Sequence, residues 1–287
     1  MTADIPGPEK VTRIPKRTAP PMACDAHMHI FGPAREFPYA GDRDYTPPDA
    51  LMADYLAMRS AIGFQRTVVV QPSVYGVFNA CSIDAVRQFG ADGRGVAVID
   101  DSVSDAEIDE MNAVGFRGAR LNIVNRGVSD PRLLEKLAAR VAKWNWHVQI
   151  FSTPDILPDL VTRVKMLPVP VVIDHIGKID ARAGLDQDAV RALLDHVSSG
   201  GWAKLSGAYR VVDTGAPWAA AAPIASALVE AAPERLVWGT DWPHPSLGAS
   251  PVPNDCDLID ALYDWAPNDD IIQQVLVTNP ASLYDFD

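Results

Sequence analysis

Two histidines one residue apart, and an aspartate far along the chain, are the residues whose types and spacing most directly suggest chemistry. His27 and His29 lie in the segment CDAHMHIFGP, and Asp241 lies in GTDWPHP. Side chains two residues apart on a β-strand point to the same face, so both imidazoles can reach one site. Such a pair can hold a metal ion or a substrate oxygen, and a carboxylate beside it can act as a general base.

Further polar side chains follow other short apolar runs. His175 comes directly after VVID and is expected to converge on the same point. Arginine binds carboxylate, phosphate or sulfonate groups through two parallel hydrogen bonds, so Arg120, Arg126 and Arg210 indicate an anionic substrate. Ser73 follows VVVQP and can donate a hydrogen bond to that substrate. It lacks the GxSxG turn of a hydrolase nucleophile, so no covalent role is assigned to it.

These residues need a scaffold that brings distant segments together. Eight short apolar runs alternate with amphipathic segments, which is typical of parallel strands joined by helices and predicts an α/β protein with a (β/α)8 TIM barrel. The active site of such a barrel forms where its strands end, and its first and last strands are neighbours. The predicted strands are 22–29, 67–71, 95–99, 118–121, 147–151, 171–173, 202–205 and 236–238.

The chain is expected to form one catalytic domain over residues 22–287, preceded by an extended arm over residues 1–21. The arm carries five prolines and no apolar periodicity, and 287 residues suit one barrel better than two average domains. The predicted helices are 49–62, 105–114, 132–143, 155–166, 186–196 and 223–232, with a closing pair at 255–265 and 270–277.

Composition excludes several other classes. A formal net charge of −12 argues against nucleic acid or an anionic membrane as partner. No apolar stretch is long enough to span a membrane, and the N-terminus lacks the apolar core of a signal peptide, so a cytoplasmic location is expected. Cys24, Cys81 and Cys256 show no CxxC spacing and are expected to be reduced, mostly buried thiols.

Other residues of the same types are given structural roles. His147 begins the fifth strand, which places it at the bottom of the barrel or in its wall. His196 lies on a predicted helix and is expected to be solvated or to pack. Arg117 precedes its strand and is expected to form an ion pair on the exterior.

The segments HMHIFGP, RLNIVNR, VVIDHIGK and VWGTDWPHP resemble the amidohydrolase superfamily. The resemblance is to amidohydrolase family 2, in the branch of 2-pyrone-4,6-dicarboxylate lactonase and related sugar-acid and muconolactone-type lactonases. It runs from about residue 22 to LVTNPASLYDF at the C-terminus. The fold it implies is a distorted barrel of the amidohydrolase type, and the implied activity is hydrolysis of a carboxylic ester in a lactone ring.

Many members of the wider superfamily hold divalent metals through the HxH pair, a sixth-strand histidine, an eighth-strand aspartate, and often a fourth-strand lysine or fifth-strand histidine. Here Arg120 and Phe151 end the fourth and fifth strands, so a binuclear site would lack its bridging ligand. One zinc ion bound by three histidines and an aspartate stays open: His27, His29, His175 and Asp241. The branch resembled implies hydrolysis without a metal or other cofactor.

The resemblance also implies residue roles. Asp241 is the general base that takes a proton from water, and His27, His29 and His175 polarise the lactone carbonyl. The anionic small-molecule substrate is held by residues that carry charge or hydroxyl groups: Arg120, Arg126, Arg210, Ser73 and Tyr45.

Two residues of this chain differ from those at the matching positions of the pyrone dicarboxylate enzyme, and three alternative functions stay open. Phe151 replaces a carboxylate-binding tyrosine, and Tyr75 stands where that enzyme has a histidine; both changes are expected among the substrate contacts. The reaction is therefore expected to be retained, on a substrate such as 2-pyrone-4,6-dicarboxylate or a muconolactone that carries a carboxylate or sulfonate. The alternatives are a mononuclear zinc amidohydrolase or decarboxylase, a lactone isomerase, and a barrel retained only for binding. The oligomeric state stays open.

Overall fold

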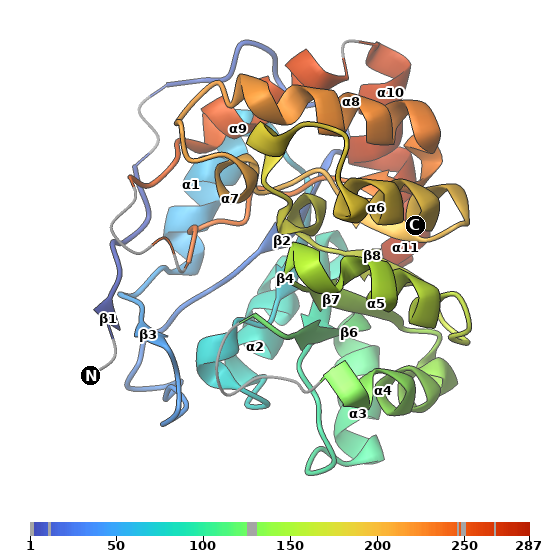
Figure 1. Ribbon diagram of the computed structural model, residues 1–287. Coiled ribbons are helices and arrows are strands. Elements are labelled where there is room, and N and C mark those ends of the chain that lie inside the picture. Colours follow the sequence, from blue (N-terminus) through green and yellow to red (C-terminus); the bar gives the residue numbers. More distant parts are fainter. Residues whose placement is uncertain (1–2, 11–12, 125–130, 246, 248–250, 267) are drawn as a thin grey trace.

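Eight parallel strands form the centre of the molecule, with helices around them (Figure 1). The computed structural model describes residues 3–10, 13–124, 131–245, 247, 251–266 and 268–287. Along the sheet the strands follow chain order, as the sequence predicts. They are β2 (Cys24–Met28), β4 (Arg66–Val70), β5 (Gly93–Ala97), β6 (Phe116–Asn122), β7 (His147–Phe151), β8 (Val171–Ile173), β9 (Trp202–Lys204) and β10 (Leu236–Val237).

The first and last strands of this sheet meet and close a barrel. Ala26 N–H donates to Trp238 O at 2.9 Å, and Asp241 N–H donates to His27 O at 2.8 Å. Just beyond the strands, Met28 and Trp242 form a parallel bridge. The closure places Asp241 beside the histidine pair, which confirms the predicted (β/α)8 barrel.

An irregularity in β2 determines which of its side chains face the barrel interior. The pairing of β2 with β4 shifts register between Asp25 and Met28. Ala26, inside this irregular stretch, packs in the inner apolar cluster, whereas Asp25 points outward and accepts a hydrogen bond from Tyr55 on α1 (Met52–Ile62) at 3.1 Å. His27, also inside the stretch, and His29, beyond it, both face Asp241. Such a bulge re-aims side chains, as is common near active sites.

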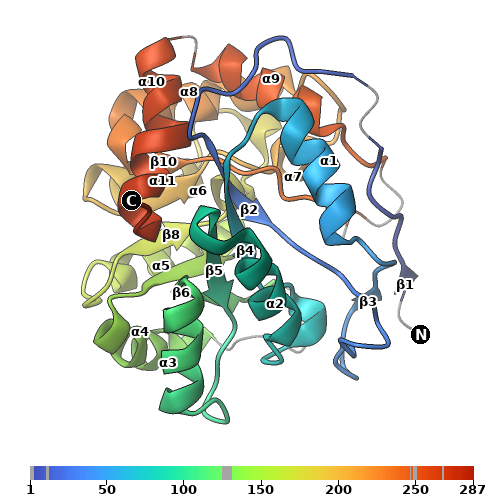
Figure 2. The same cartoon turned by 180° about the vertical axis from the view of Figure 1, so that it is seen from behind.

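Helices cover the outside of the barrel. The sequence prediction omits α2, which lies between β4 and β5 and faces the viewer in Figure 2. It also omits the single-turn α7, which carries Arg210. The remaining bounds, after α1, are α2 (Ala80–Phe89), α3 (Asp105–Val114), α4 (Leu134–Val141), α5 (Leu157–Val164), α6 (Asp188–Ser198), α7 (Ala208–Val211), α8 (Ala222–Ala231), α9 (Asp255–Trp265), α10 (Asp269–Gln273) and α11 (Asn279–Tyr284).

The N-terminal arm runs along the side of the barrel in both views (Figures 1 and 2). Its strand β1 (Ala3–Asp4) pairs in parallel with β3 (Tyr45–Thr46). Farther along, Arg13 forms ion pairs with Asp257 and Asp260 on α9. The arm thus contacts the rest of the chain at two separate points. Within the described residues, no helix is both long enough and apolar enough to cross a membrane.

Candidate active site

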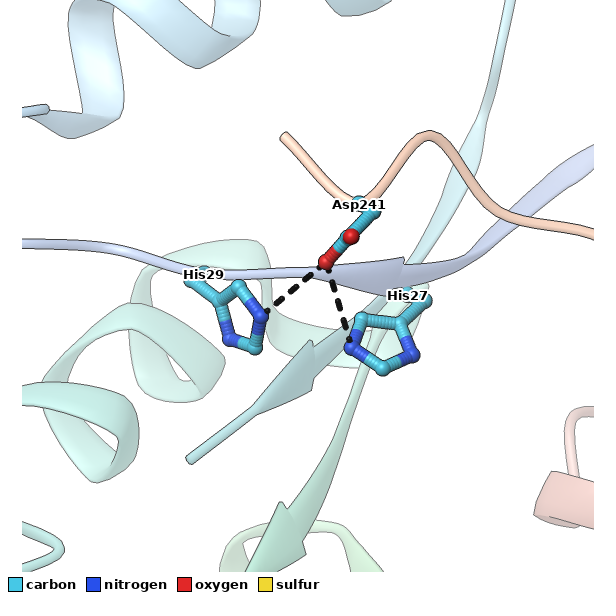
Figure 3. Close-up of side chains that lie close together, drawn as sticks. All are labelled: His27, His29 and Asp241. Atoms are coloured by element: carbon cyan, nitrogen blue, oxygen red, sulfur yellow. Dashed lines mark ion pairs between the residues drawn. The ribbon is translucent and has the colours of Figure 1, made fainter. Parts of the chain in front are cut away.

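Three histidines surround one carboxylate at the carboxyl ends of the strands. From Asp241 Oδ1 the distance is 3.3 Å to His29 Nε2 and 3.7 Å to His27 Nε2 (Figure 3). His175 Nε2 lies 3.6 Å from the other oxygen, Oδ2. All four side chains are buried. The structure thus brings together the three histidines and the aspartate that the sequence singled out.

Asp241 is held in its ionised form by two neighbours that the loop after β9 supplies. Arg210 Nε and Tyr209 OH both donate to Oδ2, at 2.6 and 2.5 Å. Burial alone would raise the pKa of this carboxyl group, but Arg210 and the histidines hold the pKa well below its usual range. Within the described part of the chain, Oδ1 has no hydrogen-bond donor. One ionised oxygen therefore remains available for a water proton.

The Nδ1 atoms of His29 and His175 have hydrogen-bond partners of different kinds. His29 Nδ1 lies 2.7 Å from the carbonyl oxygen of Val70, which can only accept. Burial lowers the pKa of His29, so in its neutral form the proton is on Nδ1 and Nε2 is an acceptor. His175 Nδ1 lies 2.8 Å from Ser206 Oγ, which can donate or accept. His29 is therefore suited to accept a hydrogen bond from a bound water, which differs from the carbonyl-polarising role that the family resemblance implies for it.

A buried lysine beneath this cluster is a functional candidate that the sequence analysis missed. Lys204 Nζ donates to Ala26 O at 2.9 Å and to Gln149 Oε1 at 2.8 Å, and lies 3.2 Å from His27 Nδ1. Burial lowers the pKa of Lys204 to about 8, with Asp174 opposing the shift. The lysine is therefore largely charged at neutral pH. Side chains alternate along β9, which puts Lys204 on the same face as the buried Trp202. This alternation is the sequence signal that could have identified the lysine as buried.

Asp174, which ends the β8 segment, connects the lysine to the predicted substrate arginine. Its Oδ2 accepts from Arg120 Nε at 3.3 Å and from Gln149 Nε2 at 3.0 Å. Its Oδ1 lies 3.6 Å from Lys204 Nζ and 3.4 Å from His27 Nδ1. Burial favours the neutral acid, but Lys204 and its other neighbours hold the pKa of Asp174 well below its usual range. The carboxylate therefore fixes Arg120 in the barrel mouth.

A narrow cavity opens above Asp241 and His29. Four of the five predicted substrate residues line it, while Arg126 lies outside the described residues. Pro245 also lies there, and Arg210 Nη2 donates to its carbonyl oxygen at 2.8 Å. The lining comprises His29, Tyr45, Pro72, Ser73, Arg120, Asn122, Phe151, Arg210, Asp241 and Pro245.

Phe151 lies among three cationic side chains. Its ring centre is 5.4 Å from Arg120 Cζ, 5.7 Å from Arg210 Cζ and 5.9 Å from Lys178 Nζ. Lys178, in the turn after β8, was not singled out by the sequence analysis, although it follows His175 by three residues. The cations give the mouth a positive field despite the acidic chain.

Several residues lie away from this cavity. Tyr75 is absent from the lining of this cavity, and its hydroxyl accepts from Gly32 N–H at 2.8 Å, so the expectation that it contacts the substrate is wrong for this cavity. His147 packs against Tyr284 at the barrel floor. His196 is buried with Nε2 3.2 Å from Val171 O, and Arg117 forms an ion pair with Asp285. The three cysteines are all buried and free.

The spacing of the central atoms suits a divalent metal ion, but the surrounding charges do not. The ligating atoms of His27, His29 and Asp241 lie within 4.8 Å of one another. A metal-binding histidine normally donates its second N–H to a carboxylate, carbonyl or water. His29 does so, but His27 Nδ1 lies closer to the Lys204 ammonium, at 3.2 Å, than to the Asp174 carboxylate, at 3.4 Å, and Asp241 is already neutralised by Arg210. The residues present therefore do not fit a metal ion.

A buried histidine–carboxylate cluster at the mouth of a (β/α)8 barrel is the arrangement that the resemblance to amidohydrolases implies. The family model described as amidohydrolase matches residues 24–286. The chain therefore belongs to the amidohydrolase family.

Characterised relatives span nearly the whole chain. The 2-pyrone-4,6-dicarboxylate hydrolase of Comamonas testosteroni is 39% identical, over 94% of this chain and 92% of that protein. A 4-sulfomuconolactone hydrolase of Rhizobium radiobacter is 35% identical, over 92% and 90%. The D-galactarolactone isomerase of Agrobacterium fabrum is 27% identical, over 94% and 93%. An Agrobacterium tumefaciens crystal structure superposes with a TM-score of 0.87 at 26% identity, covering 95% of this chain and 99% of that chain.

Proposed function

We propose that this protein hydrolyses a lactone that carries a carboxylate or sulfonate group, without a metal ion. The observation that carries the proposal is an ionised, buried Asp241 whose Oδ1 faces two histidines beneath a cationic mouth. Two relatives named as hydrolases of 2-pyrone-4,6-dicarboxylate and 4-sulfomuconolactone support the substrate class. Both named substrates are anionic lactones.

Asp241 is the general base in this mechanism. Water bound between Asp241 Oδ1 and His29 Nε2 attacks the lactone carbonyl carbon as its proton passes to Asp241. His27 and His175 donate from Nε2 to the carbonyl oxygen and stabilise the charge that develops there. When the tetrahedral intermediate collapses, the ring C–O bond breaks and Asp241 returns the proton to the leaving oxygen. The product is the ring-opened hydroxy acid or its keto form.

The substrate's anionic groups lie among the cations of the mouth. Arg120 is buried and oriented by Asp174, so its outer N–H groups can bind a carboxylate or sulfonate. Ser73 and Tyr45 line the same cavity and add hydroxyl groups, and Lys178 adds a cation at its edge. We include Arg126 in this set on the family resemblance.

Lactone isomerisation is the second candidate, because one relative is named as a lactone isomerase. An isomerase needs a base but no site for water. Hydrolysis is favoured here because His29 Nε2 and Asp241 Oδ1, 3.3 Å apart, are both acceptors that one water molecule can bridge.

The proposal is tested by a panel of carboxylated pyrones, sulfonated and carboxylated muconolactones, and neutral aldonolactones. Ring opening is followed by loss of substrate absorbance and by proton release. The expected result is turnover of anionic lactones well above that of neutral ones, and none with Asp241→Asn. Inactivity on every lactone would refute the proposal.

A further inference from the structure

Two neighbours of His27 Nδ1 determine which ring nitrogen carries the proton, and they favour opposite tautomers. Lys204 Nζ lies 3.2 Å from His27 Nδ1, and Asp174 Oδ1 lies 3.4 Å from the same atom. The ammonium group can only donate, so it requires an unprotonated Nδ1. The carboxylate can only accept, so it requires a proton there. A neutral imidazole can satisfy one of the two.

The contacts around Lys204 favour a hydrogen bond from Lys204 to His27 Nδ1 over one from His27 Nδ1 to Asp174. Two of its three protons go to Ala26 O at 2.9 Å and Gln149 Oε1 at 2.8 Å. The nearest acceptor for the third is His27 Nδ1, since Asp174 Oδ1 is farther away, at 3.6 Å. A proton on Nδ1 would face a buried ammonium. Asp174 already accepts from Arg120 and Gln149 on its other oxygen.

We infer that Lys204 is a positioning residue that keeps His27 protonated on Nε2 and unprotonated on Nδ1. His27 Nε2 points toward Asp241 Oδ1 in the site (Figure 3) and has no hydrogen-bond partner among the described residues. In this tautomer it presents an N–H to the substrate. The catalytic consequence rests on the proposed function, in which His27 donates to the carbonyl oxygen.

The same tautomer disfavours metal binding at His27. A metal ion needs the Nε2 lone pair, which exists only when the proton is on Nδ1. Without Lys204, Nδ1–H would donate to Asp174, and three acceptor atoms would converge: His27 Nε2, His29 Nε2 and Asp241 Oδ1. With Lys204 present, His27 donates a hydrogen bond from Nε2; without Lys204, the same nitrogen would be able to bind a metal ion.

The wild-type protein provides the first test. Histidine labelled with nitrogen-15 gives proton–nitrogen correlation spectra that distinguish protonated from unprotonated ring nitrogens, and His27→Gln identifies the His27 signals. We expect a proton on Nε2 and none on Nδ1. A proton on Nδ1 would overturn the inference. No lactone is needed, so inactivity on every lactone would refute the proposed function and leave this inference standing.

Variants of the two competing neighbours provide the second test. Lys204→Met keeps an unbranched side chain, one atom shorter, and removes the ammonium group. It should move the His27 proton to Nδ1 and raise zinc affinity at least tenfold, measured by competition with a chromophoric chelator. Asp174→Asn is the matched control and should keep the wild-type tautomer. An unchanged tautomer in Lys204→Met, or a proton on Nδ1 in Asp174→Asn, would contradict the inference. If Lys204→Met does not fold, the other two spectra still decide.

Discussion

Arg210 Nε donates to Asp241 Oδ2 at 2.6 Å, while Nη2 of the same guanidinium donates to Pro245 O at 2.8 Å. The arginine therefore connects the loop after β9 to the carboxylate that follows β10. Its role in the proposed reaction is to hold Asp241 in position as well as to supply positive charge to the mouth.

Arg210→Lys should lower kcat more than it raises KM. The two contacts use separate guanidinium nitrogens, Nε and Nη2, which one lysine nitrogen does not reproduce. Asp241 would therefore shift, and a displacement of about 1 Å can cost on the order of 100-fold in rate. Steady-state kinetics on an active lactone measures the change. A rise in KM with unchanged kcat would instead assign Arg210 to substrate binding alone.

Asp241→Asn should abolish turnover and leave substrate binding largely intact. The amide cannot take the proton from water, and general-base catalysis contributes roughly 100- to 10,000-fold. Turnover and binding calorimetry test this together. Asp213→Asn, at an exposed ion pair with Arg182, is the control. Retained turnover in Asp241→Asn would remove the base from the mechanism.

Phe151→Tyr should shift selectivity toward dicarboxylate lactones. The new hydroxyl would lie among Arg120, Arg210 and Lys178, where it can donate to a second carboxylate. The measurement is the ratio of kcat/KM for 2-pyrone-4,6-dicarboxylate to that for a singly charged muconolactone. The ratio should rise about tenfold, in line with one added hydrogen bond to a charged group. An unchanged ratio would show that Phe151 does not contact the distinguishing group.

The lowered pKa of His147 should make the free energy of unfolding decrease as the pH falls. Burial, followed by the Lys204 charge, lowers the pKa of His147 to about 3 in the folded protein, whereas the unfolded chain protonates near pH 6.5. Because the unfolded state then binds more protons, stability is lost as the pH falls below 6.5, by about 2 kcal/mol between pH 7 and 5. Denaturant unfolding of His147→Leu should show a correspondingly smaller loss. Equal losses in both proteins would contradict this assignment.

Much of the fold could be predicted because apolar runs mark the strands directly. The predicted bounds 147–151 and 171–173 match β7 and β8, and barrel closure follows from strand count. Helix α2 is less evident because its segment mixes small, polar and apolar residues. The inward histidines were found by their two-residue spacing, but that spacing alone would also aim Asp25 inward. The register shift in β2 turns Asp25 outward.

The pairings inside the barrel could not be predicted. Lys204, Gln149 and Asp174 come from three different strand segments, and only their distances show which atoms share protons. From the sequence, a lysine in a short apolar strand is assigned to the solvent-facing side. Closure of the barrel buries Lys204 instead. The sequence therefore predicted the residues around Asp241 but not the network that orients them.

The most direct test of metal-free lactone hydrolysis is turnover by chelator-treated protein in water labelled with oxygen-18. The substrates are 2-pyrone-4,6-dicarboxylate and 4-sulfomuconolactone, and mass spectrometry measures the label in the product. We predict an undiminished rate and one labelled oxygen in the new carboxylate. Loss of turnover that zinc restores, or an unlabelled rearranged product, would contradict the account.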